Sequence, residues 1–314
     1  MRAVAVKAFK AEPELIQVPK PDPAEGEVLV KVEYAALNPF DWRVADGALE
    51  GVAPHVFPLV LGGDFAGRVD VVGPGDNRFR VGDAVFGQAG RPPVGTGTYA
   101  EYVTMPQDGA ITYVPDGLSL KTASLLPTAG MTAAQILAAA GVTAGQSLLV
   151  IGAAGGVGSL LTQLAAARGV RVLAAVRGDE EQRMAALGAA ATIDVTAQDA
   201  GSAVRAGCPA GIDALIDLVS ADPDAFTAYA AHVRPGGRAL TTRSVAGAAR
   251  LPQGVEGVDF QQHPSAALLD TLAAAAADGE LLVPVDAELP LEKAPEALAT
   301  SRAGGARGKT VFAL

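Results

Sequence analysis

The stretch that most constrains this chain is residues 147–159, Ser-Leu-Leu-Val-Ile-Gly-Ala-Ala-Gly-Gly-Val-Gly-Ser. A short apolar run stops at glycines, and apolar residues then return at the three- and four-residue spacing of one helix face. The pattern predicts a buried parallel strand over residues 148–151, then a tight turn, then a helix that carries Leu160 and Leu164. A strand, turn and helix in this order are typical of an alternating α/β domain.

The glycines of this turn can do what other residues cannot. Without a Cβ atom the main chain can take a positive φ, approach a pyrophosphate closely and let the helix pack near its strand. The N–H groups of the helix N-terminus then face the anion. A turn that serves packing alone is the alternative, since the chain holds 37 glycines. We expect a dinucleotide to bind at Gly152, Ala154, Gly155, Gly156, Val157 and Gly158.

Charge and composition exclude several classes of partner. The 314 residues carry a net charge of −10, which disfavours non-specific binding to nucleic acid or to anionic lipid. Alanine- and leucine-rich stretches such as residues 159–176 are interrupted by Arg168 and Arg171, so none provides the uncharged run that a membrane span needs. The first residues lack a continuous apolar signal region. We therefore expect a cytoplasmic protein with neither nucleic-acid nor membrane partners.

The rest of the chain suggests two kinds of domain. Residues 1–115 show short strands between Gly and Pro, over residues 28–32, 65–72 and 81–86, which favours a β-rich domain. After the glycine turn, strand-like and helix-like segments alternate as far as residue 242, which favours a parallel sheet with helices on both faces. A helix over residues 266–277, the segment 282–285 and a terminal strand over residues 309–313 have no obvious place in that sheet.

Several motifs, in one order, resemble the zinc-independent quinone oxidoreductases of the medium-chain dehydrogenase/reductase family. They lie at residues 26–32, 38–41, 62–67, 81–85, 99–102, 153–158 and 307–311. The resemblance implies an α/β fold with a GroES-like β catalytic domain over residues 1–120. It also implies a Rossmann domain, a doubly wound parallel sheet that binds NADP(H), over residues 121–257. Residues 258–314 would then return to the catalytic domain.

The zinc-dependent alcohol dehydrogenases of the same superfamily are the nearest alternative. Their catalytic metal requires a cysteine where this chain has Asn38 and a histidine near Gly63. A catalytic zinc takes three protein ligands of the His, Cys or carboxylate type, yet His55, His232 and His263 are scattered along the chain and Cys is present once. We therefore expect no metal.

The residue at the end of the second nucleotide-domain strand should decide the cofactor. Arg177 stands there, 25 positions (177 − 152) after Gly152, and a planar guanidinium can bind the 2′-phosphate of NADPH bidentately. NADPH is therefore the expected cofactor. The alternative is that the neighbouring Asp179 and Glu180 govern the pocket, although both can also be first-turn carboxylates of the next helix. The resemblance adds Arg302 as a basic cofactor contact, with an exposed surface arginine as the alternative.

The resemblance also implies the chemistry, which is hydride transfer from a nicotinamide to a quinone or to the β-carbon of an α,β-unsaturated carbonyl. Asn38 is the candidate amide donor to the oxygen on which negative charge develops. Asp41 would orient Asn38 or Arg43, and Thr132 would line the nicotinamide. Alternatively, Asn38 is a turn residue before Pro39, Asp41 is a first-turn residue of a helix, and Thr132 is a core residue.

These expectations combine into an NADPH-dependent, zinc-independent reductase of a small-molecule quinone or enone. An enoyl-thioester reductase of fatty-acid or polyketide-type metabolism and a non-catalytic NADPH-binding protein are the two alternatives. By family analogy we also expect a homodimer, formed through edge strands of the nucleotide domain near residues 255–260, because an open sheet leaves unpaired backbone groups at its edge.

Overall fold

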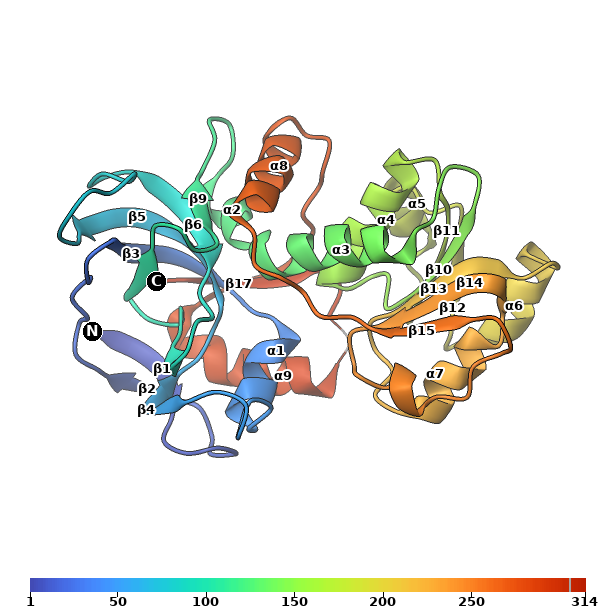
Figure 1. Ribbon diagram of the computed structural model, residues 1–314, viewed down its shortest axis with the longest axis horizontal. Coiled ribbons are helices and arrows are strands. Elements are labelled where there is room, and N and C mark those ends of the chain that lie inside the picture. Colours follow the sequence, from blue (N-terminus) through green and yellow to red (C-terminus); the bar gives the residue numbers. More distant parts are fainter. Residues whose placement is uncertain (305) are drawn as a thin grey trace. The chain divides into compact units, whose positions relative to one another are not determined.

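The structure, a computed structural model, describes residues 1–304 and 306–314 (Figure 1). The chain divides into two compact units. The first unit combines residues 1–131 with residues 264–314, and the second unit is the continuous stretch 132–263. In sequence, the second unit is thus inserted into the first.

The two boundaries between the units lie after residues 131 and 263. The domain ends expected from the sequence, at residues 120 and 257, are earlier by 11 residues (131 − 120) and 6 residues (263 − 257). The first shift arises because helix α2 (Leu120–Ser124) packs on strands β3 (Glu27–Ala36) and β5 (Asp64–Val72) of the first unit. The second arises because strand β15 (Glu256–Asp259) pairs with β14 (Val233–Thr241) and so stays with the second unit.

The first unit is built mainly from β-strands in two sheets. One sheet has the order β2-β1-β4-β7, and the other has the order β16-β17-β3-β5-β6-β9, with β8 also paired to β3. The remaining elements of this unit are β1 (Arg2–Val6), β2 (Glu14–Gln17), α1 (Pro39–Ala45), β4 (His55–Val60), β6 (Ala84–Gln88), β7 (Val94–Thr96), β8 (Tyr102–Pro106), β9 (Ile111–Tyr113), α8 (Ala266–Ala277), β16 (Val285–Pro290), η2 (Leu291–Lys293), α9 (Ala294–Ala303) and β17 (Lys309–Ala313).

The C-terminal segment completes the larger sheet of the first unit. Strand β17 runs antiparallel to β3 with Phe312 opposite Ala35, and β16 joins its other edge in parallel. Phe312 is fully buried and meets the Tyr99 ring edge-on, with 5.0 Å between the ring centroids. Full burial of a side chain of this size contributes roughly 1.5–3 kcal/mol. The last strand is therefore part of the core of the first unit.

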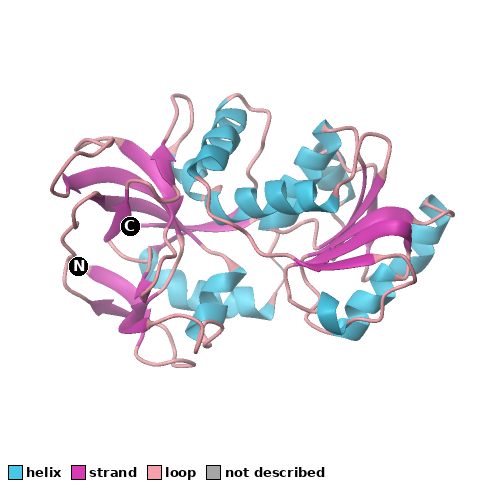
Figure 2. Ribbon diagram, in the orientation of Figure 1, coloured by secondary structure: helices cyan, strands magenta, loops and turns pink. Residues whose placement is uncertain are grey.

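The second unit is a parallel sheet in the order β12-β11-β10-β13-β14-β15. Helices lie on both faces of this sheet (Figure 2). Its elements are β10 (Ser147–Ile151), α4 (Gly156–Ala167), β11 (Arg171–Val176), α5 (Glu181–Ala186), β12 (Ala191–Asp194), α6 (Ala200–Gly207), β13 (Ile212–Asp217), α7 (Pro223–Ala230), β14, η1 (Ala246–Ala248) and β15, while α3 (Pro127–Ala140) begins in the first unit and continues into the second. This strand order reverses direction beside β10, and ligands bind at such a switch point.

The sequence explains this sheet directly. Strand β10 is buried at every position, and β11 is buried from Val172 to Val176, as expected for parallel strands that have helices on both sides. Helix α7 begins with Pro223 at its first position and with Asp222 as N-cap, whose carboxylate accepts from Asp224 N. The α/β class and the doubly wound sheet expected from the sequence are confirmed.

The segment at residues 282–285, which the sequence left without a place, lies before strand β16 and overlaps it at Val285 alone. Leu281, just before this segment, is 3% exposed and packs into the core without belonging to a strand. In β16 partly buried residues alternate with exposed ones, and hydrophobicity alone does not mark such a strand.

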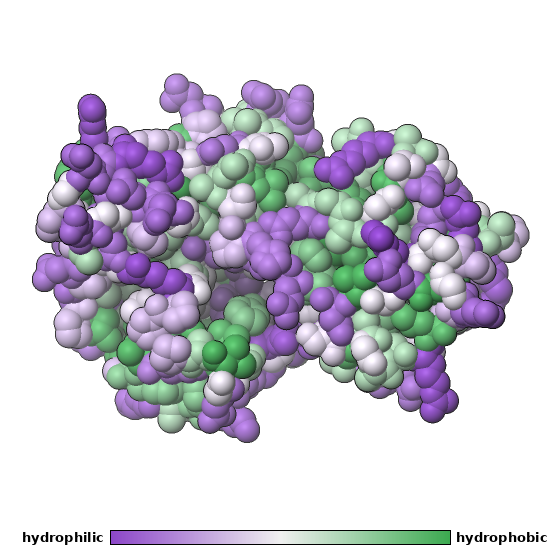
Figure 3. Space-filling view, in the orientation of Figure 1, coloured by the Kyte–Doolittle hydropathy of each residue, from purple (hydrophilic) through white to green (hydrophobic). Residues whose placement is uncertain are grey.

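The surface mixes polar and apolar residues. On the face drawn in Figure 3, hydrophilic and hydrophobic side chains are interspersed. Within residues 1–304 and 306–314, none of the helices is long and apolar enough to cross a lipid bilayer.

Candidate active site

The turn between β10 and α4 requires its glycines. Gly152 has φ +83°, a conformation that other L-residues rarely adopt. A Cβ atom on Gly158 would lie 2.3 Å from the carbonyl oxygen of Gly152 and 2.6 Å from Ala153 Cα, so the helix could not pack this close to the turn. These contacts show that the helix begins against the strand end, where a side chain would block it.

The N-terminus of α4 has the properties of an anion site. Its N-cap is Gly155, and no side chain in the described part of the chain caps it. The first N–H groups of the helix therefore lack a side-chain acceptor, and the helix dipole adds a partial positive charge at this end. A dinucleotide pyrophosphate fits these residues, because it needs bare N–H groups and a close backbone approach. The site residues expected at 152–158 thus lie together in one turn.

Helix α5, which follows β11, holds a basic residue that sequence reasoning missed. Arg177 is exposed at the end of the strand, where it was expected. Glu180 is buried, and its carboxylate accepts from Arg183 Nε at 2.6 Å. Arg183 Nη2 in turn donates to the carbonyl oxygen of Ala154 at 3.1 Å. The Arg183 guanidinium therefore joins the start of α5 to the glycine turn.

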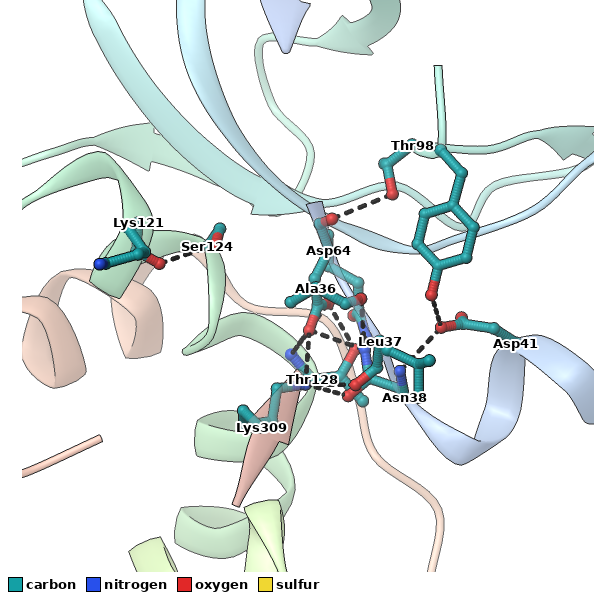
Figure 4. Close-up of polar contacts among 12 residues, drawn as sticks. Ala36, Leu37, Asn38, Asp41, Asp64, Thr98, Lys121, Ser124, Thr128 and Lys309 are labelled. Atoms are coloured by element: carbon teal, nitrogen blue, oxygen red, sulfur yellow. Dashed lines mark hydrogen bonds and ion pairs between the residues drawn. The ribbon is translucent and has the colours of Figure 1, made fainter. Parts of the chain in front are cut away.

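In the first unit, Asn38 stands at the start of α1 and is 4% exposed. Its Nδ2 donates to Asp64 Oδ2 at 2.8 Å, and its Oδ1 accepts from Lys309 Nζ at 2.5 Å (Figure 4). A second contact of Nδ2, with the carbonyl oxygen of Ala36, is 3.5 Å long and so lies at the limit of a hydrogen bond. One amide hydrogen is therefore firmly bound, and the other is bound weakly.

Asp64 and Lys309 form the charged centre of this network. Lys309 Nζ lies 3.7 Å from Asp64 Oδ2 and also donates to the carbonyl oxygen of Leu37 at 2.9 Å. Asp64 Oδ1 accepts from Thr128 Oγ1 at 2.6 Å. Burial raises the pKa of Asp64 and lowers the pKa of Lys309, while the attraction between the two charges opposes both shifts. The pair is thus strongly desolvated but compensated by hydrogen bonds.

Asp41 connects Asn38 to Tyr99. Asp41 Oδ2 accepts from the backbone N–H of Asn38 at 2.8 Å and from the Tyr99 hydroxyl at 2.6 Å. Burial raises the pKa of Asp41 to about 7, although the hydrogen bonds from Tyr99 and Asn38 lower it. Burial likewise raises the pKa of Tyr99, so the phenol stays protonated near neutral pH. Asp41 orients the backbone of Asn38, and it does so from the first turn of α1.

The other two expected site residues have separate surroundings. Thr132 is buried in α3 and belongs to the second unit, whereas Asn38 and Asp41 belong to the first. Arg302 Nη2 donates to Asp46 Oδ1 at 2.8 Å, and its guanidinium carbon lies 5.7 Å from the centre of the Trp42 ring. In this structure Arg302 is therefore held within the first unit by Asp46 and Trp42, and its contact with a cofactor remains a prediction.

Sequence reasoning did not identify Lys309, Asp64, Thr128 or Tyr99 as members of this network. A signal existed for Lys309, since it shares a short strand with the apolar run Val311-Phe312-Ala313, and a lysine is rarely buried unless it is paired. The partners of that lysine could not be found from spacing, because Asn38 is 271 residues away in sequence.

Comparison with known proteins gives the family. The family model for an alcohol dehydrogenase GroES-like domain matches residues 24–116, and the model for a zinc-binding dehydrogenase matches residues 187–312. A chloroplast envelope quinone oxidoreductase homolog of Arabidopsis thaliana is 28% identical over 313 residues, which cover 95% of this chain and 93% of that protein. The chain belongs to the medium-chain dehydrogenase/reductase family.

Solved structures agree with this assignment. A quinone oxidoreductase from Coxiella burnetii has a TM-score of 0.86 and 29% identity, and the match covers 100% of this chain and 99% of that one. A structure described as an NAD-dependent alcohol dehydrogenase has a TM-score of 0.87 and 29% identity, with both chains covered completely. The chain thus falls in the quinone oxidoreductase branch of the medium-chain dehydrogenase/reductase family and is an oxidoreductase.

One of the two family models is named for zinc, but the residues around Asn38 in this chain differ from a zinc site. The structure places the neutral amide of Asn38 beside Asp64, and Gly63 supplies no ligand. Groups of three or more His, Cys, Asp or Glu side chains able to hold a metal are not found among residues 1–304 and 306–314. A catalytic zinc takes three such ligands. The donor set at Asn38 therefore does not fit the metal.

Proposed function

We propose that this protein is an NADPH-dependent reductase that delivers hydride to a quinone or an α,β-unsaturated carbonyl without zinc. The printed names of two relatives support the substrate class, since both are called quinone oxidoreductases or homologs of one. The glycine turn supports a dinucleotide, and the family implies that this dinucleotide carries a nicotinamide.

The Asn38 amide carries this proposal. Its oxygen accepts from the Lys309 ammonium, and this polarises the amide so that its N–H groups become better donors. The hydrogen that contacts Ala36 only at 3.5 Å is the one we assign to the acceptor. A neutral, fixed donor of this kind stabilises an oxygen that becomes negative during the reaction.

The reaction balances with these groups. When bound, the reduced nicotinamide supplies the two electrons and the hydrogen nucleus of a hydride. The hydride forms a C–H bond at the β-carbon, the C=C π electrons move toward the carbonyl, and negative charge develops on its oxygen. Asn38 Nδ2 donates to that oxygen as the charge grows. Water then protonates the α-carbon, and a quinone instead takes its proton on oxygen.

The test is NADPH oxidation with a quinone, an enone and an enoyl thioester, measured before and after exhaustive chelation. We expect turnover with a quinone or an enone, and an unchanged rate after chelation. A stoichiometric metal whose removal abolishes turnover would overturn the zinc-free proposal. Turnover confined to the enoyl thioester would move the substrate to the alternative class, and tight NADPH binding without turnover on any acceptor would leave a non-catalytic binding protein.

A further inference from the structure

Helix α5 carries an arginine, Arg183, whose guanidinium has one nitrogen without a hydrogen-bond partner in the described part of the chain. Arg183 Nε and Nη2 both donate, to Glu180 and to Ala154 respectively. Arg183 Nη1 is buried and has no hydrogen-bond partner in the described part of the chain. A buried donor without a partner costs about 1–3 kcal/mol, so each such group calls for an explanation, and a bound ligand is one of them.

The position of this nitrogen is informative. The Ala154 carbonyl belongs to the glycine turn that would hold the pyrophosphate, and Glu180 follows the end of β11 by four positions (180 − 176). Nucleotide sheets of this type read the adenosine ribose between these two places. The Arg183 guanidinium contacts both of them, through Glu180 and the Ala154 carbonyl oxygen, and so lies next to the region where such sheets read the ribose.

The state of Glu180 strengthens the argument. An acidic residue in this region commonly accepts hydrogen bonds from the ribose hydroxyls of NAD. Here the Glu180 side chain is 2% exposed and is bound to Arg183 Nε. Its carboxylate is therefore already engaged by a cation. Asp179 and Glu181 are exposed, where water and salt screen their charges.

We propose that Arg183 is a specificity-determining residue, and that its Nη1 donates to the 2′-phosphate of NADPH beside the exposed Arg177. This inference rests on the NADPH dependence proposed above. The planar fork of arginine suits phosphate oxygens, and the Glu180 and Ala154 contacts hold the fork in place before the nucleotide binds. A phosphate oxygen at Nη1 also satisfies the donor that is otherwise unpaired.

The experiment is calorimetric binding at fixed low ionic strength with two matched pairs of probes. NADPH is compared with NADH, and adenosine 2′,5′-bisphosphate is compared with AMP, so that each pair differs by the 2′-phosphate. For Arg183→Gln we expect affinity for the two 2′-phosphorylated probes to fall about 10- to 100-fold, and affinity for NADH and AMP to change less than about threefold. Arg183→Lys should retain part of the discrimination, since it keeps the charge and loses the fork.

Two further variants complete the design. Arg205→Gln makes the same charge change in α6, and its affinities should equal those of the wild type. Removing Arg183 alone leaves the Glu180 carboxylate buried without its cation, so the double variant Glu180→Gln/Arg183→Gln protects the test against misfolding. The double variant should show the same loss of discrimination as Arg183→Gln.

Each contrary outcome has one meaning. If the wild type prefers NADPH and both Arg183→Gln and the double variant keep that preference, the inference about Arg183 is overturned and the NADPH proposal stands. In that case Arg177→Gln should abolish the preference for NADPH. If the wild type prefers NADH and AMP over their phosphorylated counterparts, the NADPH proposal itself fails.

Discussion

At Asn38, one amide group binds a buried ammonium through its oxygen and a buried carboxylate through its nitrogen. Asn38→Ala removes the proposed donor to the acceptor and leaves the glycine turn untouched. Losing one such donor commonly lowers turnover by about 100-fold. We expect kcat to fall by that order while the NADPH dissociation constant stays the same.

The matched control for this variant is Asn77→Ala. Asn77 also sits in the first unit and uses its amide within the protein, donating to the Glu27 carbonyl oxygen at 3.2 Å. Its kcat should equal that of the wild type. Unchanged turnover of Asn38→Ala with both a quinone and an enone would leave Asn38 as a helix-start residue that supports the buried ion pair.

Asp41 predicts an unusual dependence of stability on pH. Burial raises its folded-state pKa to about 7 from the ordinary 3.8, so the folded protein binds a proton that the unfolded chain releases. The stability that Asp41 contributes is complete below about pH 4 and is lost as pH rises to about 7. Since a tenfold change in proton binding is about 1.4 kcal/mol, the loss is on the order of a few kcal/mol.

Asp41→Asn removes this titration but keeps an oxygen that can accept from Asn38 and Tyr99. The free energy of unfolding, measured by urea denaturation from pH 4 to 8, should therefore fall with pH more steeply in the wild type than in the variant. The exposed Asp108→Asn serves as control and should follow the wild type. Parallel profiles for wild type and Asp41→Asn would show that Asp41 ionises normally.

The sequence predicted Asn38 and Asp41 as site residues but could not predict what surrounds them. A motif shows which residue type stands at a position, whereas the partners of Asn38 come from β5 and β17 and depend on strand pairing. Arg183 was missed for a similar reason. The ribose-reading position was inferred from strand length, which selects Arg177, but α5 carries a second arginine back to the glycine turn.

Among the elements, the glycine turn leaves no room for a side chain at Gly158. In Gly158→Ala the new methyl group would meet backbone atoms 2.3 and 2.6 Å away, and backbone cannot move aside as a flexible side chain can. Overpacking of this kind costs about 1–3 kcal/mol. We expect a lower free energy of unfolding for the protein and weaker dinucleotide binding, measured by urea denaturation and calorimetry.

Gly207→Ala is the matched control because Gly207 also lies in a helix of the second unit. Its nearest neighbours would be Arg171 Nη2 at 3.7 Å and Leu173 Cδ2 at 3.8 Å, both at ordinary contact distance. This variant should be unchanged or stabilised by up to about 1 kcal/mol. Equal unfolding free energies for the two variants would show that the turn adapts to a side chain.

Strand β17 carries Lys309, whose buried ion pair with Asp64 can be tested for its contribution to stability. Lys309→Met removes the cation from a buried pair and leaves Asp64 desolvated, a change that typically costs about 3–5 kcal/mol. The exposed Lys31→Met in β3 is the control and should stay within about 0.5 kcal/mol of the wild type. Adding Asp64→Asn to Lys309→Met should recover part of the loss. A double variant less stable than the single one would show that the pair does not act as a unit.

Element prediction succeeded where one period of hydrophobicity dominates. The helix expected over residues 266–277 is α8 with the same bounds, and the strand expected over residues 148–151 lies within β10. Helix α6 was missed, because two glycines in eight residues weaken its helical propensity, and its main signal is the N-cap Asp199. Such a helix forms because its tertiary neighbours hold it in place.

The parallel sheet of the second unit has an open edge at which another copy of the chain could pair. Strand β15 ends the strand order of this sheet, so one of its sides is unpaired by strands in the described part of the chain. We propose that two copies pair through it, and we expect a homodimer by light scattering at micromolar concentration. Val258→Lys places a charge on this edge and should favour monomers.

Thr192→Lys is the control for the dimer, since it places the same charge on β12 at the opposite edge of the sheet. That variant should remain dimeric. A wild type that is monomeric at micromolar concentration would remove the proposed interface.

Because the second unit is inserted into the first, the two units can complete their folding at different times during synthesis. Residues 132–263 are contiguous and can fold as soon as they have emerged from the ribosome, whereas the first unit must wait for β17. Synthesis at 5–20 residues per second separates Asn38 from Lys309, 271 residues later, by roughly 14–54 s. During that interval Asp64 has no ammonium beside it, and the apolar side of β3 lacks Phe312. The nascent first unit therefore leaves an apolar face and an unpaired carboxylate exposed until β17 has been made.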